Sequence, residues 1–109
     1  MLAKKRRIEK KLFSVSFQNS RRFNSPHLFL TLSKNENKPS RFSFSISKKI
    51  CKHAVDRNRY RRRGYSVISK NLKNIPDGFL FFFSFKKGVY PVLFSDLEKE
   101  IVGLLQNAN

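Results

Sequence analysis

The stretch Ser47–Arg63, SKKICKHAVDRNRYRRR, concentrates the charge of this 109-residue chain and gives the first indication of its fold. It holds eight Lys and Arg residues against one acid, Asp56, a net charge of +7 in seventeen residues. Ala54, Val55 and Ile68, in and just after the stretch, are apolar enough to dock a helix on a core. We therefore predict a folded basic element, rather than a disordered tail, that holds cations in a fixed array for a polyanion.

Helical phase divides this basic stretch into a docking face and an exposed face. A helix from about His53 to Leu72, at 100° per residue, gathers one apolar stripe: Tyr60, Gly64, Val67 and Ile68. The opposite face carries Asn58, Arg59, Arg62 and Arg63, and the stripe is bordered by Arg57 and Arg61. A bordering Arg can pack its stem while its head reaches water. Like charges four residues apart cost stability unless something neutralises them, so the pattern favours anion binding.

The composition of the whole chain also indicates a polyanionic partner. A net charge of +17 repels itself unless it is neutralised, which favours nucleic acid over an anionic membrane. The length suits one domain, residues 1–109, with a basic arm at 1–11 and twelve Phe to fill a core. No run reaches the roughly 18 apolar residues of a membrane span. The start lacks the apolar segment of a secretory signal, and the lone Cys51 cannot form an internal disulfide, so we expect a cytoplasmic protein.

The remaining segments predict an α+β domain. Residues 12–18 allow a short helix with Phe13 and Phe17 on one face, and 21–26 are typical of a loop. Every second residue is Leu in 27–33 and is Phe or Ile in 41–47, which predicts two strands. We expect these strands to pair as an antiparallel hairpin. NIPDG at 74–78 predicts a turn, and FLFFFSF at 79–85 a strand buried on both faces. A capping-box pattern, Ser95 with Glu98, predicts the start of a last helix with an apolar stripe.

Motifs for chemistry carried by the protein itself are missing from the sequence. The four Gly are scattered, and no Ser, Cys or Asp lies in a nucleophile motif. Neither His27 nor His53 has a Cys or His at metal-ligand spacing. We expect no catalytic residue, metal or cofactor in the protein. Two interpretations of this basic domain remain open on composition. One is a small ribosomal protein whose basic helix packs into ribosomal RNA, and the other is a stand-alone nuclease that cleaves without an RNA partner.

At Arg57-Asn58-Arg59 the chain resembles the protein subunit of bacterial ribonuclease P. The mark of that family is an Arg-Asn-Arg helix following Ser-Lys-Lys, which is Ser47-Lys48-Lys49 here. The resemblance covers nearly the whole chain, including the basic arm, the Phe13/Phe17 pair and the order strand, basic helix, Pro-Asp-Gly turn, apolar strand and last helix. Gly64 and Tyr65 depart from it, because the family pattern has an aliphatic residue and a base there. A helical Gly costs about 1 kcal/mol relative to Ala, so Gly64 predicts a bend or an early helix end.

The resemblance implies both a fold and a partnership. The fold is an α+β two-layer sandwich of the αβββαβα type with a left-handed βαβ crossover, against the usual handedness. The partner is the ribonuclease P catalytic RNA, which carries out the Mg²⁺-dependent removal of the 5′ leader from precursor tRNA. The protein would bind the leader and promote productive binding of metal and substrate. We expect no membrane and no obligate protein partner.

The resemblance also assigns residues to RNA binding. Contact with the RNA backbone is implied for Lys48, Lys49, Arg57, Asn58, Arg59 and Arg62, to which the charge of the run adds Lys52, Arg61 and Arg63. A cleft for the leader is implied between the first helix and the sheet, lined by Phe13 and Phe17. On the cleft strand, Thr31 stands where some members carry an aromatic, and Phe29 on the same face could replace it.

Overall fold

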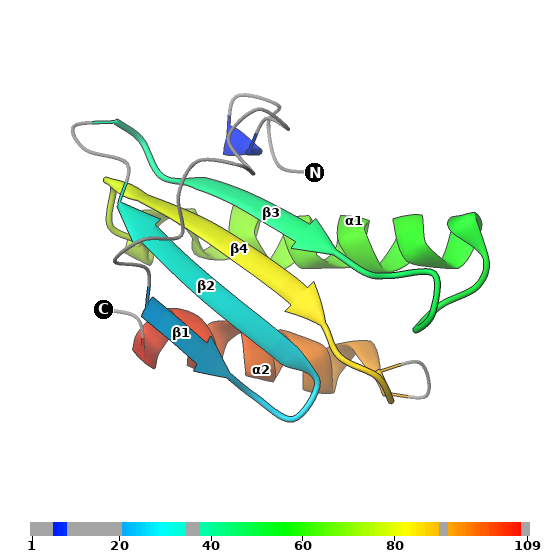
Figure 1. Ribbon diagram of the computed structural model, residues 1–109. Coiled ribbons are helices and arrows are strands. Elements are labelled where there is room, and N and C mark those ends of the chain that lie inside the picture. The colour runs from blue at the N-terminus through cyan, green and yellow to red at the C-terminus, as the bar shows by residue number, and fades with distance from the viewer. Residues whose placement is uncertain (1–5, 9–20, 35–37, 90–91, 108–109) are drawn as a thin grey trace.

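The computed structural model describes residues 6–8, 21–34, 38–89 and 92–107, and it forms a four-stranded sheet with two helices (Figure 1). Its elements are β1 (Arg21–Asn24), β2 (Leu28–Lys34), β3 (Arg41–Ser45), α1 (Ala54–Asn71), a 3-10 turn (Leu72–Asn74), β4 (Phe79–Phe85) and α2 (Phe94–Asn107). The predicted helix at 12–18, with Phe13 and Phe17, lies outside the described residues. Within the described part, the predicted α+β sandwich is confirmed.

The strand order corrects two of the sequence predictions. The order is β1-β2-β4-β3, so β4 separates β2 from β3 and the predicted hairpin between them is wrong. β2 pairs antiparallel with β4, whereas β3 pairs parallel with it. The apolar β4 takes the place between two strands because that position buries it best. Residues 21–24, predicted as loop, are a strand on the edge of the sheet, where the charges of Arg21 and Arg22 are tolerated.

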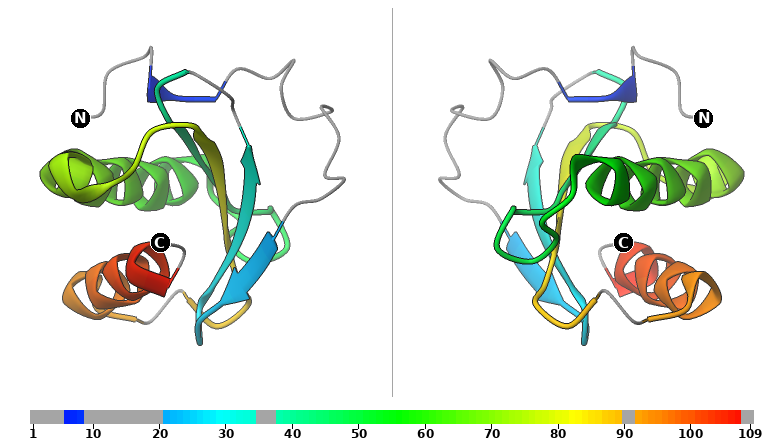
Figure 2. Two further views of the ribbon diagram at one scale, coloured as in Figure 1. Left: turned by 90° about the vertical axis from the view of Figure 1, so that its left-hand side faces the viewer. Right: turned by 90° about the vertical axis from the view of Figure 1, so that its right-hand side faces the viewer.

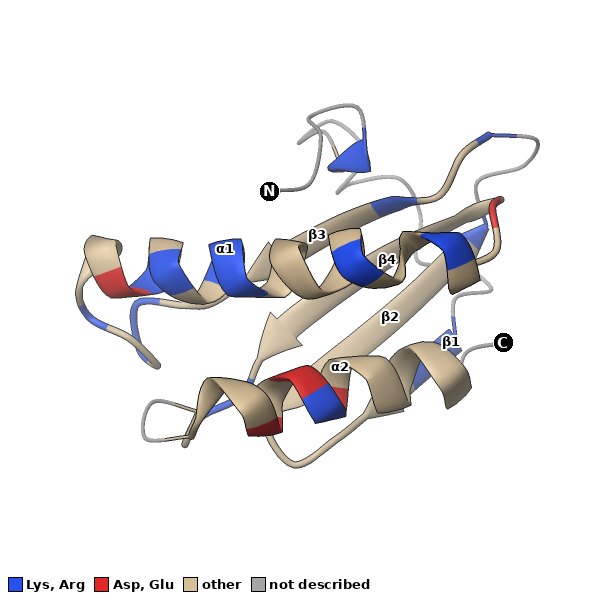
Figure 3. Cartoon of the chain, turned by 180° about the vertical axis from the view of Figure 1, so that it is seen from behind, with Lys and Arg blue, Asp and Glu red and all other residues tan. Residues whose placement is uncertain are grey.

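The connection from β3 through α1 to β4 is a left-handed crossover, as predicted. Both helices lie on one face of the sheet (Figure 2). In Figure 3 the helices are turned toward the viewer, and β3 and β4 run in the same direction. When that view is rotated so that the two strands point upward, β4 lies to the left of β3, which is the rare hand.

The core lies between the helices and the inner face of the sheet. From α1 it takes the predicted stripe, which is Tyr60, Gly64, Val67 and Ile68, and from α2 it takes Leu97, Ile101, Leu104 and Leu105. The strands add alternate Leu and Phe residues, with stacked rings at Phe42–Phe81 (5.0 Å) and Phe44–Phe83 (4.6 Å). On the outer face of β4, Leu80 is buried but Phe82 and Ser84 are half-buried. The prediction that this strand is buried on both faces therefore holds only in part.

Gly64 has a packing role that the sequence did not reveal. The helix does not end there but continues to Asn71, contrary to the prediction of an early end. A Cβ atom at position 64 would stand 2.5 Å from Cδ1 of Phe44. The glycine thus lets α1 lie directly against a Phe ring of β3. Close approach, rather than chain bending, accounts for this residue.

Helix α2 begins one residue before the predicted cap. The carbonyl of Leu93 accepts the first helical hydrogen bonds, from the N–H groups of Asp96 and Leu97, so Leu93 and not Ser95 caps the helix. Glu98 lies instead 3.9 Å from Lys70 Nζ of α1. The predicted reciprocal bond between Ser95 and Glu98 is therefore wrong, because Ser95 already lies inside the first turn.

A buried carboxylate ties the β1–β2 turn to α2. Glu100, with a side chain 13% exposed, accepts hydrogen bonds from the Ser25 hydroxyl (2.6 Å), the His27 backbone N–H (2.8 Å) and His27 Nδ1 (2.7 Å). Burial by itself raises the pKa of Glu100, but the hydrogen bonds from Ser25 and His27 outweigh it and lower the pKa below its usual value. The folded state therefore favours the ionised form.

We expect Glu100→Ala to lower the free energy of unfolding by about 2 to 3 kcal/mol at pH 7, because it strands buried donors. The control is Glu98→Ala on the same helix, whose long, half-exposed ion pair with Lys70 is worth under about 1 kcal/mol. Since the folded pKa is lowered, the stabilisation is complete above the unfolded pKa of about 4.3 and is lost as the pH falls through the folded value. Urea unfolding at several pH values measures this, and an equal loss for both variants at all pH values would contradict it.

Candidate nucleic-acid interface

The basic residues of the predicted array lie along α1 and in the loop before it. Figure 3 shows Lys and Arg along α1. Most of the acidic residues in that view lie on α2, in its lower half. Most of the predicted RNA-binding residues are exposed: Lys48, Lys49, Lys52, Asn58, Arg59, Arg62 and Arg63. The other two, Arg57 and Arg61, are half-buried. The fold thus presents the cations on a rigid helix and its flanking loop.

Arg57 holds the loop that carries the lysines. Its guanidinium donates to the carbonyl oxygens of Cys51 (3.0 Å) and Lys52 (2.8 Å). A turn precedes them, in which the Ser47 carbonyl accepts from the N–H groups of Ile50 and Cys51. The Cys51 side chain is buried under this loop. Arg57 therefore fixes the loop to the first turn of α1, a structural contact that its place in a charge run did not predict.

The arginines after it point to different neighbours. Arg61 donates to Asn58 Oδ1, and both line a groove beside β3 together with Arg62. Arg63 lies over the ring of Phe94 in α2, with its Cζ 5.1 Å from the ring centroid. For Arg59 and Arg62 the described part of the chain provides no ion pair. The run RNRYRRR is therefore divided, with Arg59 and Arg62 left to meet an external anion.

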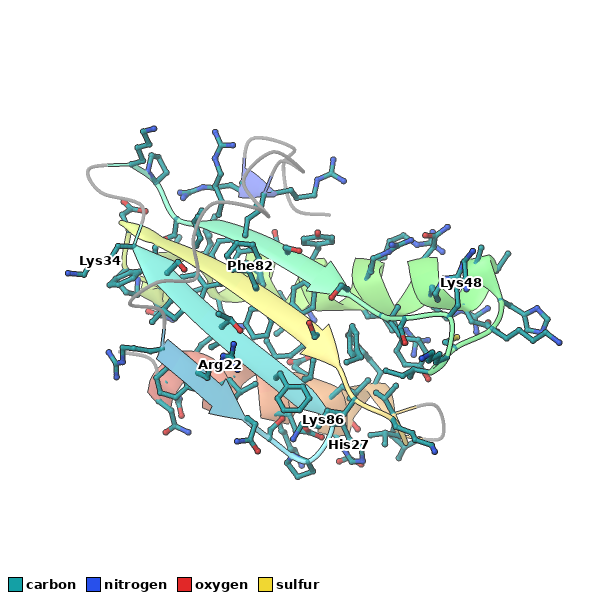
Figure 4. The ribbon with its side chains drawn as sticks, in the orientation of Figure 1. Arg22, His27, Lys34, Lys48, Phe82 and Lys86 are labelled. Atoms are coloured by element: carbon teal, nitrogen blue, oxygen red, sulfur yellow. The ribbon has the colours of Figure 1, made fainter. Side chains whose placement is uncertain are left out.

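The outer face of the sheet carries the two described residues of the predicted cleft. Phe29 is 51% exposed and Thr31 is half-buried, and both project from β2 on the face away from the helices. Their cross-strand partners on that face are Ser84 and Phe82 of β4. Figure 4 shows Phe82, Arg22 and Lys86 on the side of the sheet turned to the viewer. Phe13 and Phe17 lie outside the described residues, so their predicted place in the cleft stays a prediction.

Cations that sequence reasoning missed also surround this outer face. Lys86 Nζ lies 4.3 Å from the centroid of the Phe29 ring, and it donates to the carbonyl of Ser25 (2.7 Å). Arg22 lines a pocket of about 300 Å³ with Phe29 and Thr31. Residues 21–24, Arg-Arg-Phe-Asn, have no alternation that could have indicated a strand or the place of Arg22. An aromatic ring flanked by cations is suited to an anionic strand with exposed bases.

The described residues contain neither a candidate metal site nor a candidate membrane span. No group of three or more His, Cys, Asp or Glu side chains in those ranges could hold a metal ion. Among the same residues, neither α1 nor α2 is long and apolar enough to cross a membrane. The candidate site described so far therefore consists of cations, amides and aromatic rings.

Comparison with known proteins identifies the family. The profile of the family described as Ribonuclease P matches residues 2–109. A protein of Microcystis aeruginosa named "Ribonuclease P protein component" is 32% identical over 101 residues, covering 89% of this chain and 84% of that protein. The ribosomal interpretation is not favoured by these matches.

Solved structures share the fold of this chain. The ribonuclease P protein of Thermotoga maritima superposes with a TM-score of 0.82 at 21% identity, covering 93% of this chain and 96% of that one. The protein from Staphylococcus aureus gives 0.84 at 17% identity, covering 95% of each chain. With the family profile spanning almost the full length, the chain belongs to the ribonuclease P protein family.

Proposed function

We propose that this protein binds the catalytic RNA of ribonuclease P and helps it remove the 5′ leader from precursor tRNA. The observation that supports this most is the exposed row of Asn58, Arg59 and Arg62 on α1, whose two arginines form no ion pair with the described part of the chain. Family membership names the RNA that such a row would meet. The protein would act in the cytoplasm, where that RNA and its substrates meet.

The arrangement of the cations suits binding to an RNA backbone. Arginine forms paired hydrogen bonds with phosphate oxygens, and a helix fixes its position before binding, which lowers the ordering cost. The loop fixed by Arg57 extends the same surface with Lys48, Lys49 and Lys52. Neutralising phosphates near the cleavage site would let Mg²⁺ bind there productively rather than diffusely. In this proposal the RNA carries out the hydrolysis, and the protein supplies charge and position.

The precursor leader would lie on the outer face of the sheet. Base stacking on aromatic rings is tolerant of sequence, as a leader that differs between precursors requires. Phe29 offers such a ring, with Lys86 beside it for the phosphates. Thr31 lies next to it on the same face of β2. Phe13 and Phe17 are proposed to complete the cleft.

We expect Phe29→Ala to weaken binding of leader-bearing precursor tRNA by about fivefold or more, because stacking of one base is worth about 1 to 3 kcal/mol. Binding of mature tRNA should be unchanged, since it has no leader. Stability should change little because half of the ring is exposed. Equilibrium binding with the assembled protein–RNA complex measures both constants. The same pair of measurements on Phe17→Ala tests the other wall of the cleft. Equal losses for precursor and mature tRNA would exclude Phe29 from the leader site and would place Phe17 in the core instead.

The proposed partner can be tested by competition between RNAs. The full chain is mixed with labelled ribonuclease P RNA at fixed ionic strength, and unlabelled ribosomal RNA of matched length is added. We expect ribonuclease P RNA to be preferred by tenfold or more, because the fixed array matches one RNA shape while net charge attracts both equally. Equal affinity for the two RNAs, or cosedimentation of the chain with ribosomes, would favour the ribosomal interpretation instead.

A further inference from the structure

A groove between the edge of β3 and α1 combines cations with apolar side chains. Its walls are Ser43, Phe44 and Ser45 on β3, Val55, Asn58, Arg61, Arg62 and Tyr65 on α1, and Arg7 with Ile8. Its volume is about 730 Å³, within the range of sites that hold small organic ligands. Residues 6–8 form one end of it because the Ile8 N–H donates to the carbonyl of Phe42 (2.9 Å).

The charges of the groove are all of one sign. Arg7, Arg61 and Arg62 line it, and no acid is among its described lining residues. Arg7 Nε is buried and, within the described part of the chain, has no hydrogen-bond partner. A buried donor without a partner costs about 1 to 3 kcal/mol, so the fold holds Arg7 here at a cost. The three guanidinium groups suit an anionic ligand that accepts hydrogen bonds.

The apolar part of the lining calls for more than a phosphate. Val55, 67% exposed, adds an apolar side chain to the lining of the groove. Tyr65 is half-buried, with the Arg7 guanidinium carbon 5.9 Å from its ring centroid. Its hydroxyl accepts a hydrogen bond from the Phe44 N–H (3.4 Å), which fixes the ring beside β3. A phosphodiester backbone gains little from Val55 or Tyr65, whereas the flat face of a base could cover either one. The two lie ten residues apart on α1, about 15 Å along the helix axis, so each would take its own base.

The amide of Asn58 provides a means to recognise a base. Its oxygen accepts from Arg61, so the orientation of the amide is fixed and its NH₂ group remains to donate. The side chain lies in the same groove as Val55 and Tyr65. Amide donors of this kind read the edges of bases in single-stranded RNA.

We propose that this groove binds unpaired nucleotides of the partner RNA, with their phosphates on the arginines, one base against Tyr65 and another against Val55. The inference rests on the proposed function and makes it more specific, because it divides the α1 surface into a phosphate-binding row and a nucleotide-binding groove. Arg59, which does not line the groove, belongs to the row alone. Arg62 serves both.

Two small probes separate base binding from phosphate binding. The full chain is titrated with adenosine 5′-monophosphate and, separately, with ribose 5-phosphate, while NMR signals of Tyr65, Val55 and Asn58 are followed. We expect the mononucleotide to produce ring-current shifts at Tyr65 and Val55 that ribose 5-phosphate does not produce. Equal shifts from both probes, no shift at these residues, or shifts confined to Phe29 and Thr31 would each overturn the proposal.

Variants at Tyr65 separate stacking from the bond to β3. Tyr65→Phe keeps the ring and loses the hydroxyl, and it should bind the mononucleotide within about twofold of the unchanged protein. Tyr65→Leu should weaken it about fivefold or more. Val55→Ser should also weaken binding of the mononucleotide. Because Val55 is exposed and its replacement should not disturb the fold, this variant keeps the test valid if Tyr65→Leu folds poorly. Equal binding by Tyr65→Leu and Val55→Ser and the unchanged protein would contradict the proposal.

The proposed function and this pocket can fail separately. If the chain stimulates ribonuclease P RNA but the mononucleotide leaves Tyr65 and Val55 unshifted, only the pocket is wrong. If the shifts appear but the chain neither binds nor stimulates that RNA, the pocket stands and the identity of its RNA is wrong.

Discussion

Replacing Gly64 with leucine is expected to lower the free energy of unfolding by about 3 kcal/mol, at the upper end of the usual cost of overpacking. A Cβ at this position would already lie 2.5 to 2.8 Å from three atoms of the Phe44 ring. That ring cannot move aside easily, because it stacks on Phe83 at 4.6 Å and packs edge-on against Tyr65 at 5.2 Å. Relief would require α1 to move away from β3. Urea unfolding of the variant measures the loss.

The sign of the stability change in Gly64→Ala tests whether the contact with Phe44 explains the glycine. Helix propensity alone predicts that Gly64→Ala stabilises the protein by about 1 kcal/mol, whereas the contact with Phe44 predicts a net loss. Gly103 in α2 is the matched control, since a Cβ there meets nothing within 4 Å, and Gly103→Ala should stabilise. If Gly64→Ala stabilised as much as Gly103→Ala, close packing would not explain the glycine. Combining Gly64→Ala with Phe44→Leu should recover part of the loss.

The double variant Arg59→Ala/Arg62→Ala is expected to weaken binding of ribonuclease P RNA by about 100-fold at low salt. Each charge-assisted bond to phosphate is worth about 1.5 to 3 kcal/mol, and both side chains are exposed on the same helix. The slope of log K against log salt should decrease in magnitude by about 1.4 to 1.8, taking the DNA value of about 0.7 to 0.9 per phosphate. Filter binding over a series of salt concentrations gives both quantities.

A second double variant controls for the loss of net charge. Lys73→Ala/Lys99→Ala removes two exposed positive charges outside Ser47–Arg63, one after α1 and one on α2. It should reduce affinity only slightly, through the general field of the protein. If both double variants lowered affinity and slope equally, the protein would bind through its total charge, and the α1 row would have no special role.

Alternation and helical phase predicted most of the residues that face the core, but the expectation that Ala54 and Val55 help to dock the helix was wrong, since both are exposed. Phe42 and Phe44 alternate with serines, and Tyr60 and Val67 recur at helical spacing, and all four are buried. Neither pattern carries information on which strands are neighbours. The insertion of β4 between β2 and β3 was therefore missed from the residues themselves, although the resemblance implied the crossover that produces it.

Contacts between distant segments account for the other differences. Gly64 looked like a weakness because its value lies in Phe44, twenty residues earlier and on another element. The contact of Arg57 with the preceding loop was missed because the carbonyls that it binds carry no signal in the sequence. Glu100 binds Ser25 and His27, more than seventy residues earlier, and no pattern in the sequence links them. In each case the side chain type was visible and its partner was not.

Reconstituted cleavage at low Mg²⁺ tests the central claim most directly. The full chain is added to a bacterial ribonuclease P RNA and precursor tRNA at a Mg²⁺ concentration where the RNA alone is slow, and release of the 5′ leader is followed. We predict that the chain accelerates release, that Arg59→Ala/Arg62→Ala loses most of the acceleration, and that the chain without RNA cleaves nothing. A rate with RNA that the chain does not change, or cleavage by the chain alone, would contradict the account.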